Sequence, residues 1–441
     1  MTPPVPLAPV EVLERGRRGE PVDAASVEAF ARSWLGGDTS DAMMAAWCMC
    51  ACLRGMQPGH PEALARALVA SGERLELASL GAAGDIGTTG AVGDTVPLVA
   101  APLAASLGVL VATMGGRGVG HVGGIVDKLE SIAGFEAEMS LGAFVRQARD
   151  VGIVVAAPID RLVPGDRRLE ALRDATGTLP AAGLVAASEM VTRVACGAGA
   201  ISLLVGCGEG GPLATREEAD AAAAAMAAMG EAWGRRVRWT VADVEAPLGR
   251  AVGNALEVAE AAAVLRGAGP DDVRQLAVRM AGDLAEAAGV LDAGTGREAA
   301  AEALADGSAL ATAERWVEAQ GGDPEVWTDP GALPVAPLRV DVEAPRAGVV
   351  ARVGARALGE TARWLGAGRL HAMQAIDPVA GLEVLVRVGD VVEEGQPLAV
   401  IHAREDGAGA RARAMAEAAF VIGDDPVEAR PVVLGEGTAG A

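Results

Sequence analysis

From Ala24 to about Ser71, apolar positions recur at the three- and four-residue spacing of amphipathic helices. The first such helix, VEAFARSWL, is expected to begin after Asp23 or Ser26, because either side chain can cap a helix N-terminus. A second helix is expected near Asp41 to Arg54, and a third after Pro61. The pattern therefore predicts an all-helical N-terminal region.

The pattern changes at Leu75, and from there to Gly134 apolar runs such as LGVLVATM alternate with Gly-rich turns and short helices. Residues 166–196 return to helical spacing, whereas IVVAAP and AISLLVG read as buried strands. An Ala-rich helix is expected at 216–231 and a strand at 237–241, and helices then dominate through Glu318. This order indicates α/β units.

After Val335 the chain shifts to short β segments, including GLEVLVRVGDVVEEGQPLAVIHA with expected turns at Gly389 and Gly395. The tail after Val433 is expected to be loosely ordered. The predicted fold class is α/β: a small all-helical domain, a large mixed α/β domain and a C-terminal β-rich, hammerhead-like module.

Composition narrows the possible partners. The chain has 441 residues, of which 51% are hydrophobic, and a formal net charge of −22, so a nucleic-acid polymer would be repelled. No apolar stretch is long enough to span a bilayer, and residues 1–20 lack the apolar core of a signal peptide. We therefore expect a cytoplasmic protein with no membrane or nucleic-acid partner. Lys128 is the only lysine.

Cysteine spacing does not indicate a disulfide framework. Cys48, Cys50 and Cys52 alternate within AWCMCACL, which reads as a buried helix, and no His or acidic residue has the spacing of a further metal ligand. The favoured interpretation is that these side chains are small buried hydrophobes.

Three ordered stretches carry a resemblance to a known family. They are GDIGTTGAVGDT (84–95), MGGRGVGHVGGIVDKLESIAGFE (114–136), and the later set LGRAVGNALEV (248–258), LGAGR (365–369) and VGDVVEEGQPLAVIHA. A lone Gly-rich loop would be weak evidence. Taken together over residues 10–430, the series is similar to the thymidine/pyrimidine-nucleoside phosphorylase family (nucleoside phosphorylase class II), which is related to anthranilate phosphoribosyltransferase.

The resemblance implies a domain organisation. A helical domain would combine residues 1–70 and 163–196, an α/β domain would hold 75–160 and 197–335, and residues 336–441 would form the C-terminal module. It also implies a homodimer that associates through the helical domain and closes a cleft between domains.

In that cleft, the family's reaction transfers the sugar of a pyrimidine nucleoside to phosphate, giving a free base and a sugar 1-phosphate. The phosphate dianion must be desolvated and neutralised, which requires a lysine, hydroxyls and backbone N–H groups. The leaving base requires donors at its carbonyl oxygens. The expected ligand is therefore a pyrimidine base or nucleoside.

The Gly-rich loop departs from the family's Asp-Lys-His-Ser-Thr-Gly-Gly-Val-Gly-Asp. Ile86 and Gly87 stand at the lysine and histidine positions, so no catalytic residue is assigned. Losing a charged partner costs about 2–3 kcal/mol and a neutral hydrogen bond about 1 kcal/mol. The sum predicts that phosphate binding is weakened by orders of magnitude.

Other phosphate positions also differ from the family. Pro97, Gly115 and Ile125 replace hydroxyl residues. The residual phosphate loop is expected to comprise Thr88, Thr89, Gly90, Gly115 and Ile125. Arg117 is also present in the family beside the lysine, so a structural role is favoured for it.

The positions expected to contact the base match the family better. Arg173, Ser188 and Val119 match family positions that contact the base, whereas Thr192 replaces a lysine and Glu170 a tyrosine. Ser188 and Thr192 lie four residues apart, so both are expected to face the cleft. Alternatively, Arg173 pairs with a neighbouring carboxylate and holds the helical domain.

The resemblance implies no organic cofactor, but it does imply a monovalent cation, potassium, held by backbone carbonyls and one carboxylate. The matching positions are Gly93, Thr95, Leu248, Ala251 and Glu260. The alternative is that Glu260 is a plain cap or salt-bridge partner.

None of the four histidines falls at the catalytic position, and His121 is expected to have a packing role. Glu170, Glu189 and Glu209 lie in or near the modified cleft, where a carboxylate can activate water against a glycosidic carbon; solvated surface acids are the alternative.

Three functions are therefore weighed for this chain. The first is a phosphorolysis-deficient homologue that still binds a pyrimidine or nucleoside. The second is an enzyme of changed chemistry, such as a nucleoside hydrolase or another glycosyl transferase. The third is a working phosphorylase that uses backbone donors together with Thr88, Thr89 and Arg117.

Overall fold

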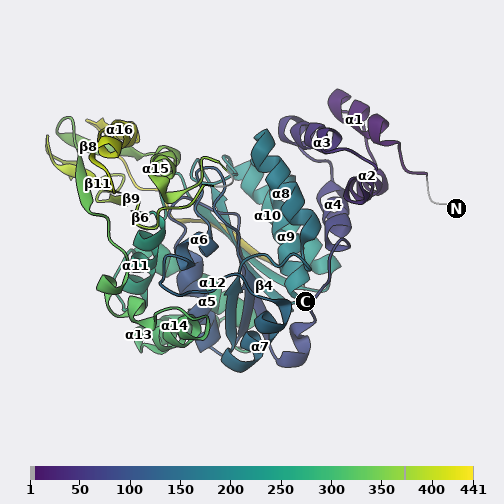
Figure 1. Ribbon diagram of the computed structural model, residues 1–441, viewed down its shortest axis with the longest axis horizontal. Helices are drawn as coiled ribbons and strands as arrows, with labels where there is room; N and C mark the ends of the chain where they lie inside the picture. Colours follow the sequence, from purple (N-terminus) through teal and green to yellow (C-terminus); the bar gives the residue numbers. More distant parts are fainter. Residues whose placement is uncertain (1–4, 372–373, 441) are drawn as a thin grey trace.

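The computed structural model describes residues 5–371 and 374–440 (Figure 1). Asp23 caps the second helix, because its carboxylate accepts from the backbone N–H of Ser26 at 2.8 Å. The Ser40 hydroxyl caps the third in the same way. The N-terminal region is helical as predicted, with α1 (Pro9–Arg18), α2 (Ala24–Gly36), α3 (Asp41–Arg54) and α4 (His60–Val69).

A six-stranded sheet forms the centre of the molecule, with the strand order β13-β5-β4-β1-β2-β3. The five strands from β5 to β3 are parallel, which agrees with the predicted α/β class. Their bounds are β1 (Ala83–Thr88), β2 (Leu110–Met114), β3 (Ile153–Ala156), β4 (Ala200–Cys207) and β5 (Arg236–Asp243).

The prediction of a loose tail after Val433 is wrong. Residues Val433–Ala439 form β13, which pairs antiparallel with the edge strand β5. Its glycine-containing sequence, VLGEGTA, has weak strand propensity. The backbone hydrogen bonds offered by the open edge of β5 order this segment, and that edge lies about two hundred residues earlier in the chain.

Helices cover both faces of the sheet and create two cores. On one face, α9 and α10 share a continuous core with the N-terminal bundle. On the other face, α5, α11, α12 and α14 build the second core. The helices are α5 (Val96–Ser106), α6 (Ile125–Leu129), α7 (Leu141–Val151), α8 (Pro164–Thr176), α9 (Ala182–Cys196), α10 (Arg216–Ala232), α11 (Asn254–Leu265), α12 (Asp271–Ala288), α13 (Gly296–Ala305) and α14 (Ser308–Ala319).

The opposite edge of the sheet is closed by a side chain. The buried Gln320 carboxamide accepts from the backbone N–H of Val155 in β3 at 3.2 Å and donates to its carbonyl at 2.9 Å. Trp316 donates to the same carboxamide at 2.7 Å. Gln320 thus supplies the hydrogen bonds that a further strand would make.

The C-terminal module has two small antiparallel sheets and its own core. One sheet has the order β6-β9-β11-β7 and includes β6 (Ala251–Val252), a segment that precedes α11, so it ties the module to the α/β region. The remaining elements are β7 (Leu338–Glu343), β8 (Gly348–Val353), β9 (Gly381–Val384), β10 (Val391–Val392), β11 (Pro397–Ala403), β12 (Phe420–Gly423), α15 (Ala355–Ala362), η4 (Arg363–Ala367) and α16 (Asp406–Glu417).

The helical bundle and this module lie on opposite sides of the sheet, at the upper right and upper left of Figure 1. The domain boundaries expected from the sequence stay a prediction, because the bundle and one sheet face share one core.

Within residues 5–371 and 374–440, no helix combines the length and apolar character needed to cross a bilayer. Cys48 is fully buried, as expected, whereas Cys50 and Cys52 are partly exposed.

Candidate active site

A cavity of about 490 Å³ lies where β1 and β2 end. The carboxyl ends of parallel strands are the usual location of ligand sites in open α/β sheets. The walls come from the loop after β1, the loop that joins β2 to α6, the helices α8 and α9, and α15 of the C-terminal module. The cavity therefore joins all three regions of the fold.

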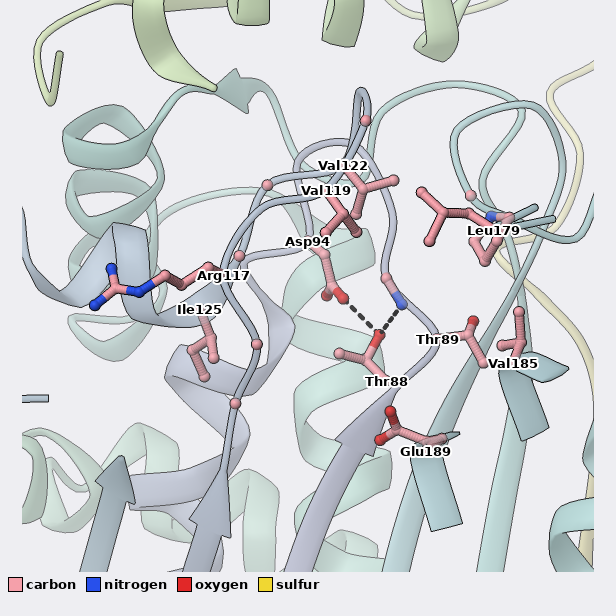
Figure 2. Close-up of a pocket in the computed structure, with 18 of the residues that line it drawn as sticks. Thr88, Thr89, Asp94, Arg117, Val119, Val122, Ile125, Leu179, Val185 and Glu189 are labelled. Atoms are coloured by element: carbon pink, nitrogen blue, oxygen red, sulfur yellow. Dashed lines mark hydrogen bonds between the residues drawn. The ribbon is translucent and has the colours of Figure 1, made fainter. Parts of the chain in front are cut away.

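The loop after β1 uses its own hydroxyl groups to hold its shape (Figure 2). Thr88 donates its hydroxyl proton to Asp94 at 2.6 Å and accepts from the Gly90 backbone N–H at 3.0 Å. The Thr89 hydroxyl accepts from the backbone N–H of Gly206 at 2.9 Å. Thr88 thus spends its hydroxyl proton on Asp94, whereas Thr89 uses its hydroxyl oxygen to hold Gly206.

Apolar side chains line the cavity around this loop. Ile86, Pro97 and Ile125 all line the cavity, and Ile86 is only 4% exposed because it belongs to the buried strand β1. A Cβ built on Gly115 would overlap the Cγ2 of Ile125. The Ile125 side chain therefore fills the space that any side chain at position 115 would need.

A second glycine makes room for a carboxylate. A Cβ on Gly87 would overlap Oε1 of Glu189 and would lie 2.6 Å from Cδ2 of Leu203, its register partner in β4. A histidine at position 87 is therefore incompatible with Glu189 in this position. Figure 2 shows the Glu189 carboxylate directly below Thr88, at the end of β1.

The two cations nearest to this end of the cavity are paired inside the protein. Lys128 Nζ lies 2.7 Å from Glu257 Oε2 and donates to the Asp94 carbonyl at 2.5 Å. Arg193 donates to Asp85 Oδ1 at 2.6 Å, and both Lys128 and Arg193 are almost fully buried.

Arg117 points away from the loop after β1 (Figure 2). Its guanidinium donates to Glu130 and Glu138 and contacts Asp127. These contacts support the structural role favoured from the sequence. His121 is also held by the protein, with its Nε2 3.2 Å from the Glu209 carbonyl oxygen; burial first, and then Arg356, lowers the pKa of its imidazole.

The cavity holds carboxylates that are shifted towards their neutral form. Burial raises the pKa of Asp94, Glu170 and Glu189 above the usual carboxyl range. Among the described residues, Asp94 Oδ1 and Glu189 Oε1 have no hydrogen-bond partner. These carboxyls bring no cationic charge to this end of the cavity, and any of them that is ionised opposes the binding of a dianion.

On the other side of the cavity, Arg173 organises the turn between α8 and α9. Its guanidinium donates to the carbonyls of Thr178 at 3.3 Å and Leu179 at 2.6 Å, and to the Ser188 hydroxyl at 3.3 Å. The ion pair with a neighbouring carboxylate weighed in the sequence does not occur within the described residues; backbone carbonyls take that place.

Ser188 lines the cavity and donates to Asp166 Oδ1 at 2.6 Å. Val119, Val122 and Glu170 also line the cavity, and Val119 pairs with Val122 across a tight turn.

Thr192 does not line the cavity, which corrects the expectation that it faces the cleft with Ser188. Its hydroxyl is within 3.5 Å of the Ser188 carbonyl, along its own helix. Glu209 is likewise not a lining residue, because it pairs with Arg352 of the C-terminal module.

The residues expected to hold a cation do converge. Gly93 has a φ of 71°, and a Cβ there would overlap the carbonyl oxygen of Leu248 and lie 2.9 Å from that of Ala251. Glycine at position 93 thus lets two carbonyls approach the loop after β1.

Glu260 completes this group from α11. It accepts from the backbone N–H groups of Arg250 at 2.6 Å and Ala251 at 3.1 Å, and from the Thr95 hydroxyl at 3.1 Å. Burial raises the pKa of Glu260 to about 7. Several hard oxygens and one buried carboxylate fit a monovalent cation, whose charge would hold Glu260 ionised.

Sequence reasoning missed several cavity residues. Arg193 was not singled out, although its i,i+4 spacing from Glu189 on α9 signals a contact. Arg356 and Arg363 reach the cavity from the C-terminal module, and only the packing of that module places them there. Within the described chain, Arg356 and Arg173 are lining cations for which no ion pair is seen, and Arg356 lies on the His121 side.

Comparisons with known proteins agree with this architecture. Residues 10–72 match the helical bundle domain of a glycosyl transferase family, residues 80–310 match its a/b domain, and residues 349–423 match the pyrimidine nucleoside phosphorylase C-terminal domain.

The chain is similar along most of its length to several curated proteins. It is 38% identical over 401 residues to a pyrimidine-nucleoside phosphorylase of Staphylococcus haemolyticus, with 90% of this chain and 92% of the relative covered. The same coverage holds for the pyrimidine-nucleoside phosphorylases of Geobacillus stearothermophilus, at 39% identity, and Bacillus subtilis, at 37%.

Among solved structures, the chain is similar in fold to anthranilate phosphoribosyltransferase from Thermus thermophilus. The TM-score is 0.55 at 22% identity, over 70% of this chain and 99% of that one.

Burial of Asp166 makes the free energy of unfolding depend on pH. Burial raises the pKa of this carboxyl from 3.8 to about 7. A carboxyl with a raised folded-state pKa contributes stability that is complete below pH 4 and is lost as the pH rises to about 7. Asp166→Asn mimics the neutral form, so between pH 5 and pH 8 the variant should gain up to about 4 kcal/mol over the wild type.

Urea unfolding at pH 5, 6.5 and 8 measures this difference. Asp41→Asn is the matched control, because hydrogen bonds from Trp34 and Arg168 lower the pKa of Asp41, and its effect should have the opposite sign. A pH-independent difference for Asp166→Asn would contradict the expected shift.

Proposed function

Because the chain belongs to the pyrimidine-nucleoside phosphorylase family, we propose that its cavity binds a pyrimidine base or nucleoside but does not support phosphorolysis. The observation that carries this proposal is the character of the cavity where β1 ends. Ile86, Pro97 and Ile125 line it, and within the described residues Asp94 and Glu189 each have a carboxylate oxygen without a hydrogen-bond partner.

A phosphate dianion would lose its hydration there without gaining a cation. Lys128 and Arg193 are already neutralised by Glu257 and Asp85. Removing either cation from its partner would leave a buried, unpaired carboxylate, which costs about 3–5 kcal/mol. The Thr88 hydroxyl offers no compensation, since it already donates to Asp94.

The side of the cavity that is expected to contact the base supports the binding part of the proposal. Ser188, Glu170 and the Arg173 guanidinium line one wall, and Val119, Val122, Leu179 and Val185 supply apolar surface. Polar groups at the ring edge with apolar contacts on its faces are suited to a planar, uncharged heterocycle.

Ligand titration tests the proposal. Isothermal titration calorimetry and thermal-shift measurements with phosphate, thymine, uracil, thymidine and uridine would accompany a phosphorolysis assay. We expect binding of a base or nucleoside, no saturable binding of phosphate near the loop after β1, and no sugar 1-phosphate.

Phosphate-dependent release of base would contradict the proposal, and so would the absence of pyrimidine binding. If phosphate binds without turnover, Arg356→Met distinguishes a surface contact beside His121 from a site in the loop after β1, since only the former loses affinity.

We also propose that a potassium ion binds between Gly93, Thr95, Leu248, Ala251 and Glu260. The convergence of the Leu248 and Ala251 carbonyls on Gly93, beside a buried carboxylate, supports it. The ion would brace the loop after β1 against the segment that precedes α11.

The expected result is a melting temperature a few degrees higher in potassium chloride than in tetramethylammonium chloride at equal ionic strength, since a ligand of the native state stabilises it. Glu260→Gln should abolish the difference. Equal melting temperatures of the wild type in the two salts would contradict the site.

We further propose a homodimer formed through the helical bundle. Supporting this, α1 and α3 expose the apolar side chains of Val10, Met49 and Leu53, and Leu53 is 75% exposed. Such clustered exposure is typical of a protein–protein interface.

Sedimentation velocity should therefore find a dimer in the wild type and a monomer for Leu53→Glu, because burying an unpaired charge opposes association. Leu385→Glu, at an exposed leucine of the C-terminal module, is the matched control and should stay dimeric. A monomeric wild type would refute the interface.

A further inference from the structure

Glu189 lies between the two halves of the cavity. It follows Ser188 directly on α9, and its carboxylate reaches across to Gly87 at the end of β1 (Figure 2). In the proposed function Ser188 and Arg173 contact the pyrimidine ring, and the loop after β1 forms the opposite wall of the cavity. A nucleoside held by its ring against Ser188 would therefore present its glycosidic bond towards Glu189.

Glu189 shares a cationic neighbour, Arg193, with a second carboxylate, Asp85. Arg193 already donates to Asp85 Oδ1 at 2.6 Å, to the Thr113 hydroxyl at 2.6 Å and to the backbone carbonyls of Ile86 and Met114. Arg193 Nε lies 3.2 Å from Glu189 Oε1, but neither atom has a hydrogen-bond partner in the described structure. One guanidinium therefore faces two carboxylates, Asp85 and Glu189, so the three groups together keep one negative charge when both carboxylates are ionised.

The surroundings make Glu189 a proton acceptor of raised basicity. Its side chain is 16% exposed, and burial raises its pKa. Among its neighbours, Asp85 on β1 and Glu170 on α8 also raise the pKa of Glu189, while Arg193 on α9 and the Thr88 backbone N–H lower it. A carboxylate with a raised pKa is the kind that enzymes use as a general base near neutral pH.

We propose that Glu189 activates a water molecule against the glycosidic carbon, so that this chain hydrolyses a pyrimidine nucleoside to the free base and the free pentose. This inference rests on the proposed function, because the nucleoside must first bind against Arg173 and Ser188. Water is a suitable nucleophile at the end of the cavity beside β1, because its activation requires a general base rather than cations. Glycine at position 87 leaves the space that the Glu189 carboxylate occupies.

Every proton in this step has a donor and an acceptor among Glu189, Ser188, Asp166 and solvent. Water gives a proton to Glu189 as its oxygen forms a bond to the anomeric carbon. The carbon–nitrogen bond breaks, and its electron pair leaves with the pyrimidine. Ser188 gives the ring a proton and receives one from Asp166, whose carboxyl lies 2.6 Å away and has its pKa raised to about 7 by burial. Solvent then returns the proton from Glu189 to Asp166.

The test is an assay in phosphate-free buffer with uridine and thymidine, in which chromatography measures free base and a reducing-sugar assay measures pentose. We expect equimolar base and pentose from the wild type. Glu189→Gln, which keeps the shape but not the basicity, should lower the rate about 100-fold or more while nucleoside binding measured by calorimetry is retained. Glu189→Asp should keep part of the rate.

Glu209→Gln is the matched control, because Glu209 also carries an unpartnered oxygen but lies outside the cavity, and its rate should equal that of the wild type. The wild-type rate should rise with pH as Glu189 ionises and fall above about pH 7 as Asp166 loses its proton; Glu189→Gln should lack the rise.

Nucleoside binding without base release would overturn the inference and leave the proposed function standing, as would an unchanged rate in Glu189→Gln. Absence of nucleoside binding would refute both.

Discussion

The buried guanidinium of Arg193 is the contact on which the rest of the site depends. From the last turn of α9 it donates to Asp85, to the carbonyls of Ile86 and Met114, and to the Thr113 hydroxyl, so one side chain ties the helix to β1 and to the end of β2. A charge so deeply buried is stable only while these partners remain in place. The same helix carries Ser188 and Glu189, and their positions relative to the sheet follow from this anchor.

Around this anchor, two glycines each make room for a larger side chain. Ile125 fills the space beside Gly115, and Glu189 fills the space beside Gly87. In each case a glycine on one element accommodates a larger side chain from another element. Tight packing makes such pairs interdependent, because neither larger side chain fits if its glycine is exchanged. The result is a cavity end lined by apolar and acidic side chains.

The loop after β1 is held in shape by its own side chains and by neighbouring segments. Thr88 and Asp94 brace it from within, Lys128 holds the Asp94 carbonyl, and Glu260 caps the facing segment through backbone N–H groups. Most of these bonds involve backbone atoms or residues outside the altered positions. Loop geometry and ligand chemistry are therefore separable here, which is why a recognisable fold does not by itself fix the reaction.

Hydrophobic periodicity and ordered motifs are local properties of the chain, so they were sufficient to predict the helical N-terminal region, the α/β class, the β-rich module and the family. They also led to the prediction that Ile86, Gly87, Gly115 and Ile125 are altered phosphate positions. The folded structure revealed that Thr192 lies outside the cavity, that residues 433–439 complete the sheet, and that Glu189 occupies the space beside Gly87. Each of these depends on a contact between segments far apart in the chain, or on the rotation of a helix against the sheet, and packing alone sets both.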